Sequence, residues 1–538
     1  MSTKEKVIKN NQSIVPFFGD RMDFIRGLDP LGLQNTSDAT FSLLLPGLNN
    51  VTGRIRYYSF YCWLLDEYAN RVGSTAPEVQ RKFIRTAEYI IALSSQYYED
   101  GNGSIPGSNY ANVQVQDEKR NVHDLNAGIY KPDGTTAKTY WNFSWGAFGQ
   151  YYLGSMRDIG IIIDRESNGG VYARTNSIEQ SFISGEMLAK AFDNNVKNKK
   201  ELFFECLNNG FVSEEQLKTL LPEFNLTKVP DNTTEQELLS RLIIQKDYPL
   251  HIEEESATLR NKTIYHLLKF NQTEPENFND REFVYFAYAA KGKANGELDN
   301  SLMGWYYYQF NEFWHFANTS IFNGTLDFLE DNYGPNWVQV NQLVDNLTNE
   351  LIDSFAAENL LFSPDDTVME LMKRLSENEF DYLKRIKSKS KVEKIKDGFL
   401  LLFSQFLSNS EELILLKEFG ENNELAKDGE GAGYFLLQFK NKLDLPFKSF
   451  IRDYIYKNII YRHQYVAFRK IRGGSLSTQK FIIEDQHIRY LGNFDAAFTG
   501  PRIGSLISFL KDLKVLSKNN ELTDFGLELL TQITPKND

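Results

Sequence analysis

Several features that mark exported proteins and many enzymes are scarce in this sequence. Its 538 residues include only two cysteines, Cys62 and Cys206, so a disulfide framework is excluded and a reducing compartment, the cytoplasm, is expected. No apolar run approaches the roughly 18 residues of a transmembrane helix, and residues 1–12 are polar. Neither a membrane span nor a signal peptide is therefore expected.

Motifs for metals, nucleotides and activated nucleophiles are also missing. The six histidines include no pair with each other or with cysteine at the spacing of metal ligands. We therefore expect no metal and no cofactor, and a non-enzymatic role is favoured over catalysis.

Helical periodicity and a large apolar content dominate what remains. Hydrophobic residues make up 41% and aromatic residues 14% of the chain, enough for several large cores. The sequence predicts a mainly α, multi-domain protein with winged-helix-like units that contain short β-hairpins. We expect an N-terminal domain over 1–195, a helical body over 196–445 and a basic C-terminal domain over 446–538.

The winged-helix prediction depends on a pattern that occurs twice. Residues 143–192 and the stretch from about 501 to 530 each read as a helix, a tight hairpin with threonine at its exit, and a second helix. In the second copy, the helix that starts near Arg502 would be the recognition helix. Short joins of this kind are also common in other mixed folds, and many winged helices bind proteins instead of nucleic acid.

Residues 39–68 contain two arginines at the expected start of a buried helix, where a positive charge is unfavourable. From Ile55 to Leu65 apolar residues cover almost every helical angle, so a buried helix is expected. Arg54 and Arg56 would lie at its start, where the helix dipole favours anions. They need carboxylate partners or an external anion. Because residues two apart on a helix point away from each other, the two arginines cannot easily hold one anion together, and one should face inward. Arg54 and Arg56 are therefore predicted to form structural ion pairs with carboxylates elsewhere in the chain.

Charge is distributed unevenly along the chain. The whole sequence carries −13, but residues 452–518 contain twelve lysines and arginines against five aspartates and glutamates. This local excess of seven positive charges predicts contact with DNA or RNA at the C-terminal end. The alternative is an amphipathic helix with solvated cations. The candidate nucleic-acid-binding residues are Arg462, His463, Arg469, Lys470, Arg472, Arg502, Lys511 and Lys514.

One short segment suggests an enzymatic alternative. Arg260, Asn261 and His266 resemble the Arg-Asn-x4-His motif of the HEPN ribonucleases. The resemblance implies that Arg260 would hold an RNA phosphate and that His266 would act as general acid or base. Arg260 could instead pair with nearby glutamates.

Two other stretches have simpler interpretations. The aromatic residues from Trp305 to Phe316 have no lysine or arginine between them, which favours helix packing over base stacking. Residues 100–139 are rich in glycine, asparagine and aspartate, and they form a candidate surface for docking a partner.

Residues 43–65 (LLLPGLNNVTGRIRYYSFYCWLL) resemble a pattern near the N-terminus of uncharacterised bacterial proteins from anti-phage defence islands. The stretches 499–513 and 522–530 are similar to the ends of such proteins. The resemblance implies a role in defence beside effector proteins from the same operon. The expected function is a non-enzymatic sensor or scaffold that contacts nucleic acid, with a pure protein-interaction subunit or the ribonuclease as alternatives.

Overall fold

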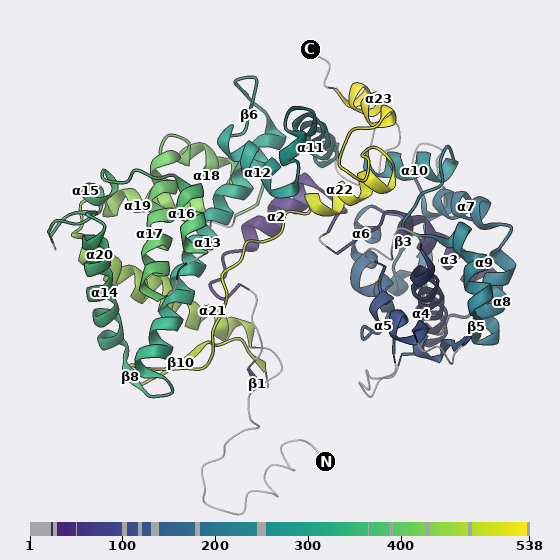
Figure 1. Cartoon of the computed structure of the whole chain (residues 1–538), viewed down its shortest axis with the longest axis horizontal. Helices are drawn as coiled ribbons and strands as arrows, with labels where there is room; N and C mark the ends of the chain where they lie inside the picture. Colours follow the sequence, from purple (N-terminus) through teal and green to yellow (C-terminus); the bar gives the residue numbers. More distant parts are fainter. Residues whose placement is uncertain are drawn as a thin grey trace, which may run out of the picture. The chain divides into compact units, whose positions relative to one another are not determined.

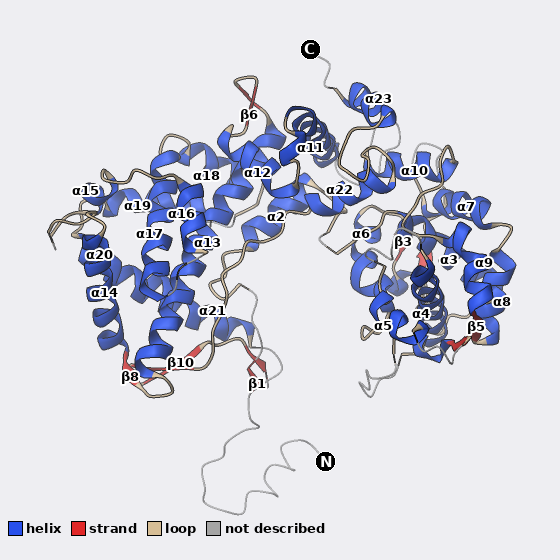
Figure 2. Ribbon diagram, viewed as in Figure 1, coloured by secondary structure: helices blue, strands red, loops and turns tan. Residues whose placement is uncertain are grey.

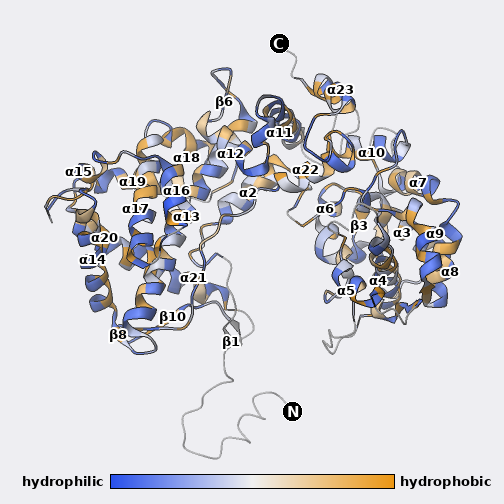
Figure 3. Ribbon diagram, in the orientation of Figure 1, coloured by the Kyte–Doolittle hydropathy of each residue, from blue (hydrophilic) through white to orange (hydrophobic). Residues whose placement is uncertain are grey.

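The computed structural model describes the chain except for residues 1–22, 25–28, 50, 99–104, 117–120, 131–138, 178–182, 245–253, 364, 388, 390, 427–430, 472–475 and 535–538. Helices account for 65% of the structure and strands for 6%, so the predicted mainly α fold is confirmed (Figures 1 and 2). Most helices carry both polar and apolar residues (Figure 3), as expected of helices that bury one face.

The described residues include no single helix that is long and apolar enough to cross a membrane. Two helices, α17 (Lys391–Ser408) and α18 (Leu413–Asn422), meet the length and composition criteria only as a pair, and the pair is bent by 92°.

The chain divides into two compact units, each made from separate segments. Unit 1 comprises residues 1–38 and 307–499, and unit 2 comprises residues 39–306 and 500–538. The boundary between residues 38 and 39 lies inside helix α2 (Asn35–Leu44), and the boundary between residues 306 and 307 lies inside helix α13 (Asn300–Tyr333). This division differs from the three consecutive segments expected from the sequence, because each unit gathers residues from distant parts of the chain.

Unit 2 is built around α3 (Arg56–Arg71), which is buried on almost all sides. The Asn49 side-chain oxygen accepts the backbone N–H groups of Val51 and Thr52 at 2.9 and 2.8 Å, which turns the chain toward this helix. Trp63 packs against several phenylalanine rings, including Phe192 at 5.2 Å between centroids. Further helices of unit 2 include α4 (Pro77–Ser94), α5 (Ser108–Val115), α8 (Lys200–Asn209), α9 (Glu214–Phe224), α10 (Thr234–Ile243), α11 (Glu254–Thr273) and α12 (Asp280–Ala289).

Unit 2 also contains the predicted order of helix, hairpin and helix twice. The first copy consists of α6 (Leu153–Asp158), β3 (Ile162–Ile163), β4 (Ala173–Arg174) and α7 (Gly185–Val196), with β3 and β4 antiparallel. The second consists of α22 (Ile503–Asp512), an antiparallel bridge between Leu516 and Leu522, and α23 (Asp524–Ile533). Two further antiparallel pairs are β2 (Val122–Asp124) with β5 (Phe211–Ser213) and β6 (Lys293–Ala294) with β7 (Glu297–Leu298).

In the first copy, the turn after the helix and the hairpin exit are joined by a short set of hydrogen bonds. Gly160 has φ +76° and donates its N–H to the Arg157 carbonyl at 3.0 Å. Thr175 donates its N–H to the Ile161 carbonyl at 3.0 Å and its hydroxyl to the Gly160 carbonyl at 3.2 Å. The Thr175 hydroxyl also accepts the N–H of Gly185, where a Cβ atom would overlap the Ile161 carbonyl.

The second copy repeats these bonds at corresponding positions. Lys514 has φ +62° and donates its N–H to the Lys511 carbonyl at 3.0 Å. Thr523 donates its N–H to the Val515 carbonyl at 3.2 Å and its hydroxyl to the Lys514 carbonyl. The Thr523 hydroxyl accepts the N–H of Gly526, whose Cβ would overlap the Val515 carbonyl. The turn and the hairpin exit are therefore bonded alike in the two copies, although the threonine precedes the glycine by 10 residues in the first copy and by 3 in the second. The winged-helix assignment itself stays a prediction.

Unit 1 is a group of helices around the C-terminal part of α13. The eight aromatic residues of α13 between positions 305 and 316 are 0–6% exposed, which confirms that this stretch is core. The surrounding helices are α14 (Val340–Ala357), α15 (Val368–Met372), α16 (Glu379–Ile386), α17, α18, α19 (Ala432–Phe439), α20 (Phe447–Tyr454) and α21 (Arg462–Lys470). A small sheet has the order β10 (Phe481–Glu484), β11 (His487–Tyr490) and β8 (Val338–Gln339), and β1 (Asp23–Phe24) pairs in parallel with β9 (Leu476–Ser477).

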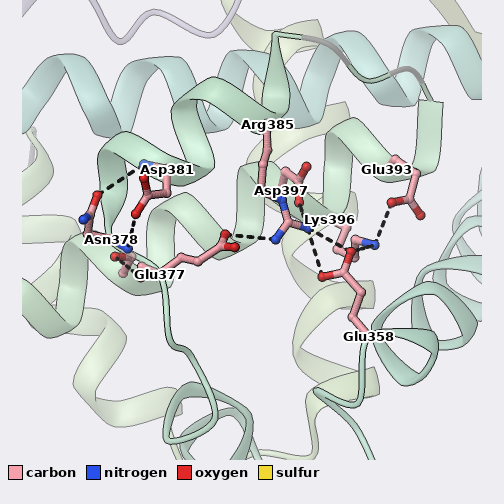
Figure 4. A network of polar contacts seen from close by, with 9 residues as sticks. Glu358, Glu377, Asn378, Asp381, Arg385, Glu393, Lys396 and Asp397 are labelled. Carbon is pink, nitrogen blue, oxygen red and sulfur yellow. Dashed lines mark hydrogen bonds and ion pairs between the residues drawn. The ribbon is translucent and has the colours of Figure 1, made fainter.

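A network of charged side chains ties α16 to α17 in unit 1 (Figure 4). Arg385 forms ion pairs with Glu358 at 2.8 Å, Glu377 at 3.0 Å and Asp397 at 2.9 Å. Lys396 lies 2.7 Å from Glu358 and thus extends the network. Burial raises the pKa of Asp397 to about 6, against the opposing effect of Arg385. The cations are shared among several carboxylates, as in a structural ion-pair network.

Candidate functional site

Arg54 and Arg56 each form an ion pair with a different carboxylate of unit 2, in agreement with the expectation. Nη1 of Arg54 lies 2.6 Å from Oδ1 of Asp512, and the second oxygen of Asp512 accepts the N–H of Ile55. Nε of Arg56 lies 3.1 Å from Oε1 of Glu235. Burial raises the pKa of Asp512 to about 7, against the opposing effect of Arg54. These arginines link distant segments and are not placed to bind an external anion.

The geometry does not support the ribonuclease alternative. Arg260 is 1% exposed, and its guanidinium donates to the carbonyls of Pro46 at 2.9 Å and Leu242 at 2.8 Å. Burial lowers the pKa of Arg260 to about 10. His266 instead contacts Asp299, with Nε2 3.2 Å from Oδ1. A guanidinium enclosed by protein carbonyls cannot hold an RNA phosphate without leaving its site.

Two residues of the basic C-terminal set connect α21 to the segment before α2. Arg462 donates to the carbonyls of Leu31 at 2.6 Å and Gly32 at 3.2 Å. Nδ1 of the buried His463 lies 2.9 Å from the Pro30 carbonyl. Both side chains therefore bind the backbone of residues 30–32 within unit 1, whereas the sequence pattern predicted that they contact nucleic acid.

The protonation of His463 follows from its neighbours. Its Nε2 accepts the backbone N–H of Lys480 at 3.0 Å, so Nδ1 carries the proton that is donated to the Pro30 carbonyl. Burial lowers the pKa of His463 to about 4. Lys470 also points inward, because its ammonium donates to the Asp29 carbonyl.

The opposite face of α21 is different, because large side chains lie there in solvent. Tyr465 is 63% exposed and Phe468 is 55% exposed, whereas Val466 and Ala467 are buried. The Arg469 guanidinium lies 5.5 Å from the centre of the Tyr465 ring. Positions three and four apart share one side of a helix, so these three residues form one surface, which we call the α21 face. It consists of Tyr465, Phe468 and Arg469.

The predicted recognition helix, α22, uses polar side chains for internal bonds. Arg502 donates to the Leu48 carbonyl at 2.8 Å and lies 5.1 Å from the centre of the Phe41 ring. The Ser508 hydroxyl donates to the Gly53 carbonyl at 2.8 Å. This side of α22 therefore packs within unit 2, and a base-reading role for Arg502 would require these bonds to break.

The remaining candidates are closer to solvent or lie outside the described residues. The Lys511 ammonium donates to the Lys518 carbonyl at 3.3 Å, and Lys514 forms an ion pair with Asp231. Arg472 lies outside the described residues. Among the described residues, no group of three or more His, Cys, Asp or Glu side chains could hold a metal ion.

Sequence reasoning missed a buried arginine on α4 that organises residues 139–143. The Arg85 guanidinium donates to the carbonyls of Gly128 at 2.7 Å, Trp141 at 2.9 Å and Phe143, and to the Thr139 hydroxyl at 2.8 Å. Its position on a helix that is otherwise rich in apolar residues was the available signal. Arg85 fixes the backbone of a segment that local composition marks only as a loop.

A buried glutamate one turn further along α4 has the complementary role. The Glu88 carboxylate accepts the hydroxyls of Tyr61 and Tyr140 and the N–H groups of Ala147 and Phe148, with distances of 2.7 Å from Tyr61, 3.1 Å from Ala147 and 2.7 Å from Phe148. Burial raises the pKa of Glu88. Arg85 and Glu88 together hold residues 139–148 against α4.

No protein-family model, no curated protein and no solved structure matches this chain.

Proposed function

We propose that the protein is a non-enzymatic scaffold or sensor subunit of a bacterial anti-phage defence system, and that it contacts an unpaired nucleic-acid strand through the α21 face. The observation that carries the proposal is the exposure of Tyr465 and Phe468 beside Arg469 on a helix whose other side is anchored. The resemblance of residues 43–65 to proteins of defence islands supports the cellular role.

The chemistry of the α21 face suits unpaired bases better than a duplex. Exposed aromatic rings stack on any base, and an arginine contributes charge and cation–π attraction. Arg462 and Lys470 are engaged with backbone carbonyls and His463 is a neutral imidazole, so few cations of α21 remain to follow a phosphate backbone. Binding should therefore be independent of sequence and should depend only modestly on salt.

Binding of a fluorescent single-stranded oligonucleotide and its duplex, measured by anisotropy at two salt concentrations, tests the proposal. The double variant Tyr465→Ala/Phe468→Ala should bind the single strand at least about tenfold more weakly, because each stacked base contributes about 1–3 kcal/mol. Tyr434→Ala, at another partly exposed aromatic position of unit 1, is the matched control. Absence of binding by the wild type, or equal binding by the double variant and the control, would overturn the proposal.

A pure protein-interaction subunit is the second candidate, and one groove favours it. A depression of about 450 Å³ lies between α10 and α23 of unit 2. Its wall contains the apolar side chains of Ile244, Phe525, Leu529 and Ile533 together with Gln236 and Arg241. Such a mixed lining suits a peptide segment of an effector protein from the same operon. Co-purification of neighbouring gene products that is lost in Leu529→Asp, without nucleic-acid binding by the wild type, would favour this candidate.

A further inference from the structure

A second depression in unit 2 has a volume of about 720 Å³ and is lined in part by residues 105–110. We call it the aromatic hollow. Its volume is in the range of small-molecule sites. Its walls come from three segments that are distant in sequence, and all of them belong to unit 2. The lining residues are Val51, Gly53, Ile105, Pro106, Gly107, Ser108, Asn109, Tyr110, Tyr140, Trp141, Asn142, Gln150 and Tyr151.

The part of the wall formed by residues 141 and 142 is fixed by buried contacts behind it. Trp141 and Asn142 belong to the segment whose backbone Arg85 fixes. Trp141 donates its Nε1–H to the side-chain oxygen of Gln150 at 2.8 Å, which sets the orientation of the indole. Its ring meets the Tyr151 ring at 76°, with 5.4 Å between centroids. The two rings therefore form a fixed corner against which a flat molecule can lie.

The polar groups of the hollow are neutral. None of the described residues that line it is Asp, Glu, Lys or Arg, so this lining offers nothing to neutralise a charged ligand. The exposed amides of Asn109 and Asn142 form no hydrogen bond within the described part of the chain. Each amide can donate and accept at the same time.

We propose that the aromatic hollow binds a nucleobase. A base combines a flat aromatic face, which can stack on Trp141 or Tyr151, with an edge of neighbouring donors and acceptors that an asparagine amide matches. Protein sites for extruded or unpaired bases use this same combination of stacking and edge hydrogen bonds. The base can be carried by a free nucleoside or by an unpaired position in a strand. This inference rests on the hollow alone and does not depend on the proposed function.

Binding is tested by calorimetry with the full chain, using adenosine, guanosine, cytidine and uridine, and maltose as a neutral sugar. A short single-stranded oligonucleotide is tested in parallel. We expect at least one nucleoside or the oligonucleotide to bind. Binding of the nucleoside identifies a free ligand as one source of the base, and binding of the oligonucleotide alone identifies a strand. Either result supports a base site if substitutions in the aromatic hollow weaken the binding that is observed.

The variants Asn142→Asp and Trp141→Ala should weaken binding at least about tenfold, whereas Trp141→Phe, which keeps a ring, should retain most of it. Asn112→Asp, an exposed asparagine on α5 that does not line the hollow, is the matched control. Asn142 is exposed, so Asn142→Asp still tests the site if Trp141→Ala fails to fold. A variant of the α21 face, Tyr465→Ala/Phe468→Ala, should leave binding at the hollow unchanged.

Four results would overturn the inference. The first is that neither the nucleosides nor the oligonucleotide bind up to millimolar concentration. The second is that Asn142→Asp and Asn112→Asp bind equally. The third is that maltose binds and loses affinity in Asn142→Asp while the bases do not bind, which would make the hollow a sugar site. The fourth is that no nucleoside binds and that oligonucleotide binding is lost only in the α21 variant, which would support the proposed function and reject the base site.

Discussion

Arg56 and Glu235 form an ion pair in which both side chains are withdrawn from water, at 1% and 0% exposure, and 179 residues separate them in the sequence. Glu235 also accepts the Ser59 hydroxyl at 2.6 Å and the Asn195 side-chain N–H at 2.6 Å. The pair thus joins α3 to α10 and α7 at the centre of unit 2.

Arg56→Met should destabilise unit 2 by about 3–5 kcal/mol, because it leaves the Glu235 carboxylate buried without its cation. The double variant Arg56→Met/Glu235→Leu should recover a large part of this loss, since no buried charge remains. Urea unfolding followed by tryptophan fluorescence measures both. Arg157→Met, which breaks the more exposed pair with Asp164, should lower the stability by less than about 1 kcal/mol. Similar losses at Arg56 and Arg157 would contradict the prediction.

Glu312 is a buried carboxyl of unit 1 that accepts the Ser37 hydroxyl and the Thr499 N–H, both at 2.6 Å. Burial raises its pKa from 4.5 to about 7. The folded protein therefore holds a proton that the unfolded chain releases, and this contribution to stability is lost as the pH rises from about 4.5 to 7.

Glu312→Gln should consequently stabilise unit 1 at pH 8 by roughly 3 kcal/mol relative to the wild type, from the pKa difference at 1.36 kcal/mol per unit. At pH 5 the advantage should fall below about 1 kcal/mol, because the carboxyl of the folded wild type is then neutral and only the unfolded chain has begun to release its proton. The amide oxygen can still accept from Thr499, and the amide N–H would donate to the Ser37 hydroxyl, which reverses the direction of that bond. Thermal unfolding at the two pH values gives the comparison, with the exposed Glu411→Gln as control. A constant difference at both pH values would refute the assignment.

His463 has the opposite dependence on pH. Burial lowers its pKa from 6.5 to about 4, so the unfolded chain binds a proton that the folded protein excludes. The free energy of unfolding should therefore fall as the pH drops from about 6.5 toward 4, by roughly 3 kcal/mol over the full interval. His463→Gln keeps a donor for Pro30 and an acceptor for Lys480 but does not titrate. The decrease in unfolding midpoint between pH 7.5 and 5 should be smaller in this variant, and an unchanged decrease would exclude His463 as its source.

The two copies of helix, hairpin and helix should share a sensitivity to added volume. Gly185→Ala and Gly526→Ala should each destabilise unit 2 by about 1–3 kcal/mol, because the new methyl group would overlap a backbone carbonyl. Gly154→Ala in α6 has open space around its Cβ and should instead stabilise the helix by about 0.5–1 kcal/mol. Differential scanning calorimetry distinguishes the signs. Tolerance of alanine at Gly185 but not at Gly526 would show that the copies differ in packing.

Local patterns in the sequence were sufficient for some of these features. The all-round apolar pattern of residues 55–65 and the uninterrupted aromatic run from Trp305 placed two buried helices, and hairpin signals located both copies of the repeated motif. The need of Arg54 and Arg56 for carboxylates also followed from helix electrostatics. Each of these inferences depends on neighbours within about ten residues.

The partners of these residues could not be predicted in the same way. Asp512 lies 458 residues from Arg54, and no periodicity connects them. Arg462 and His463 have the spacing of an exposed basic helix, but their partners are backbone carbonyls, which every residue possesses and which leave no mark in the sequence. The exposure of Tyr465, Phe468 and Arg469 on the α21 face follows from these inward contacts, which the sequence does not show.

The placement of α22 and α23 in unit 2 has a consequence for the order of events during synthesis. Asp512 supplies the carboxylate for Arg54, so residues 39–306 of unit 2 leave the ribosome long before the ion pair that Arg54 makes 458 residues away can form. Unit 1 has all of its segments once residue 499 has emerged, whereas unit 2 still lacks its last segment at that moment. We therefore expect nascent chains that end before residue 500 to expose the apolar side of unit 2 and to depend on chaperones until the last two helices arrive.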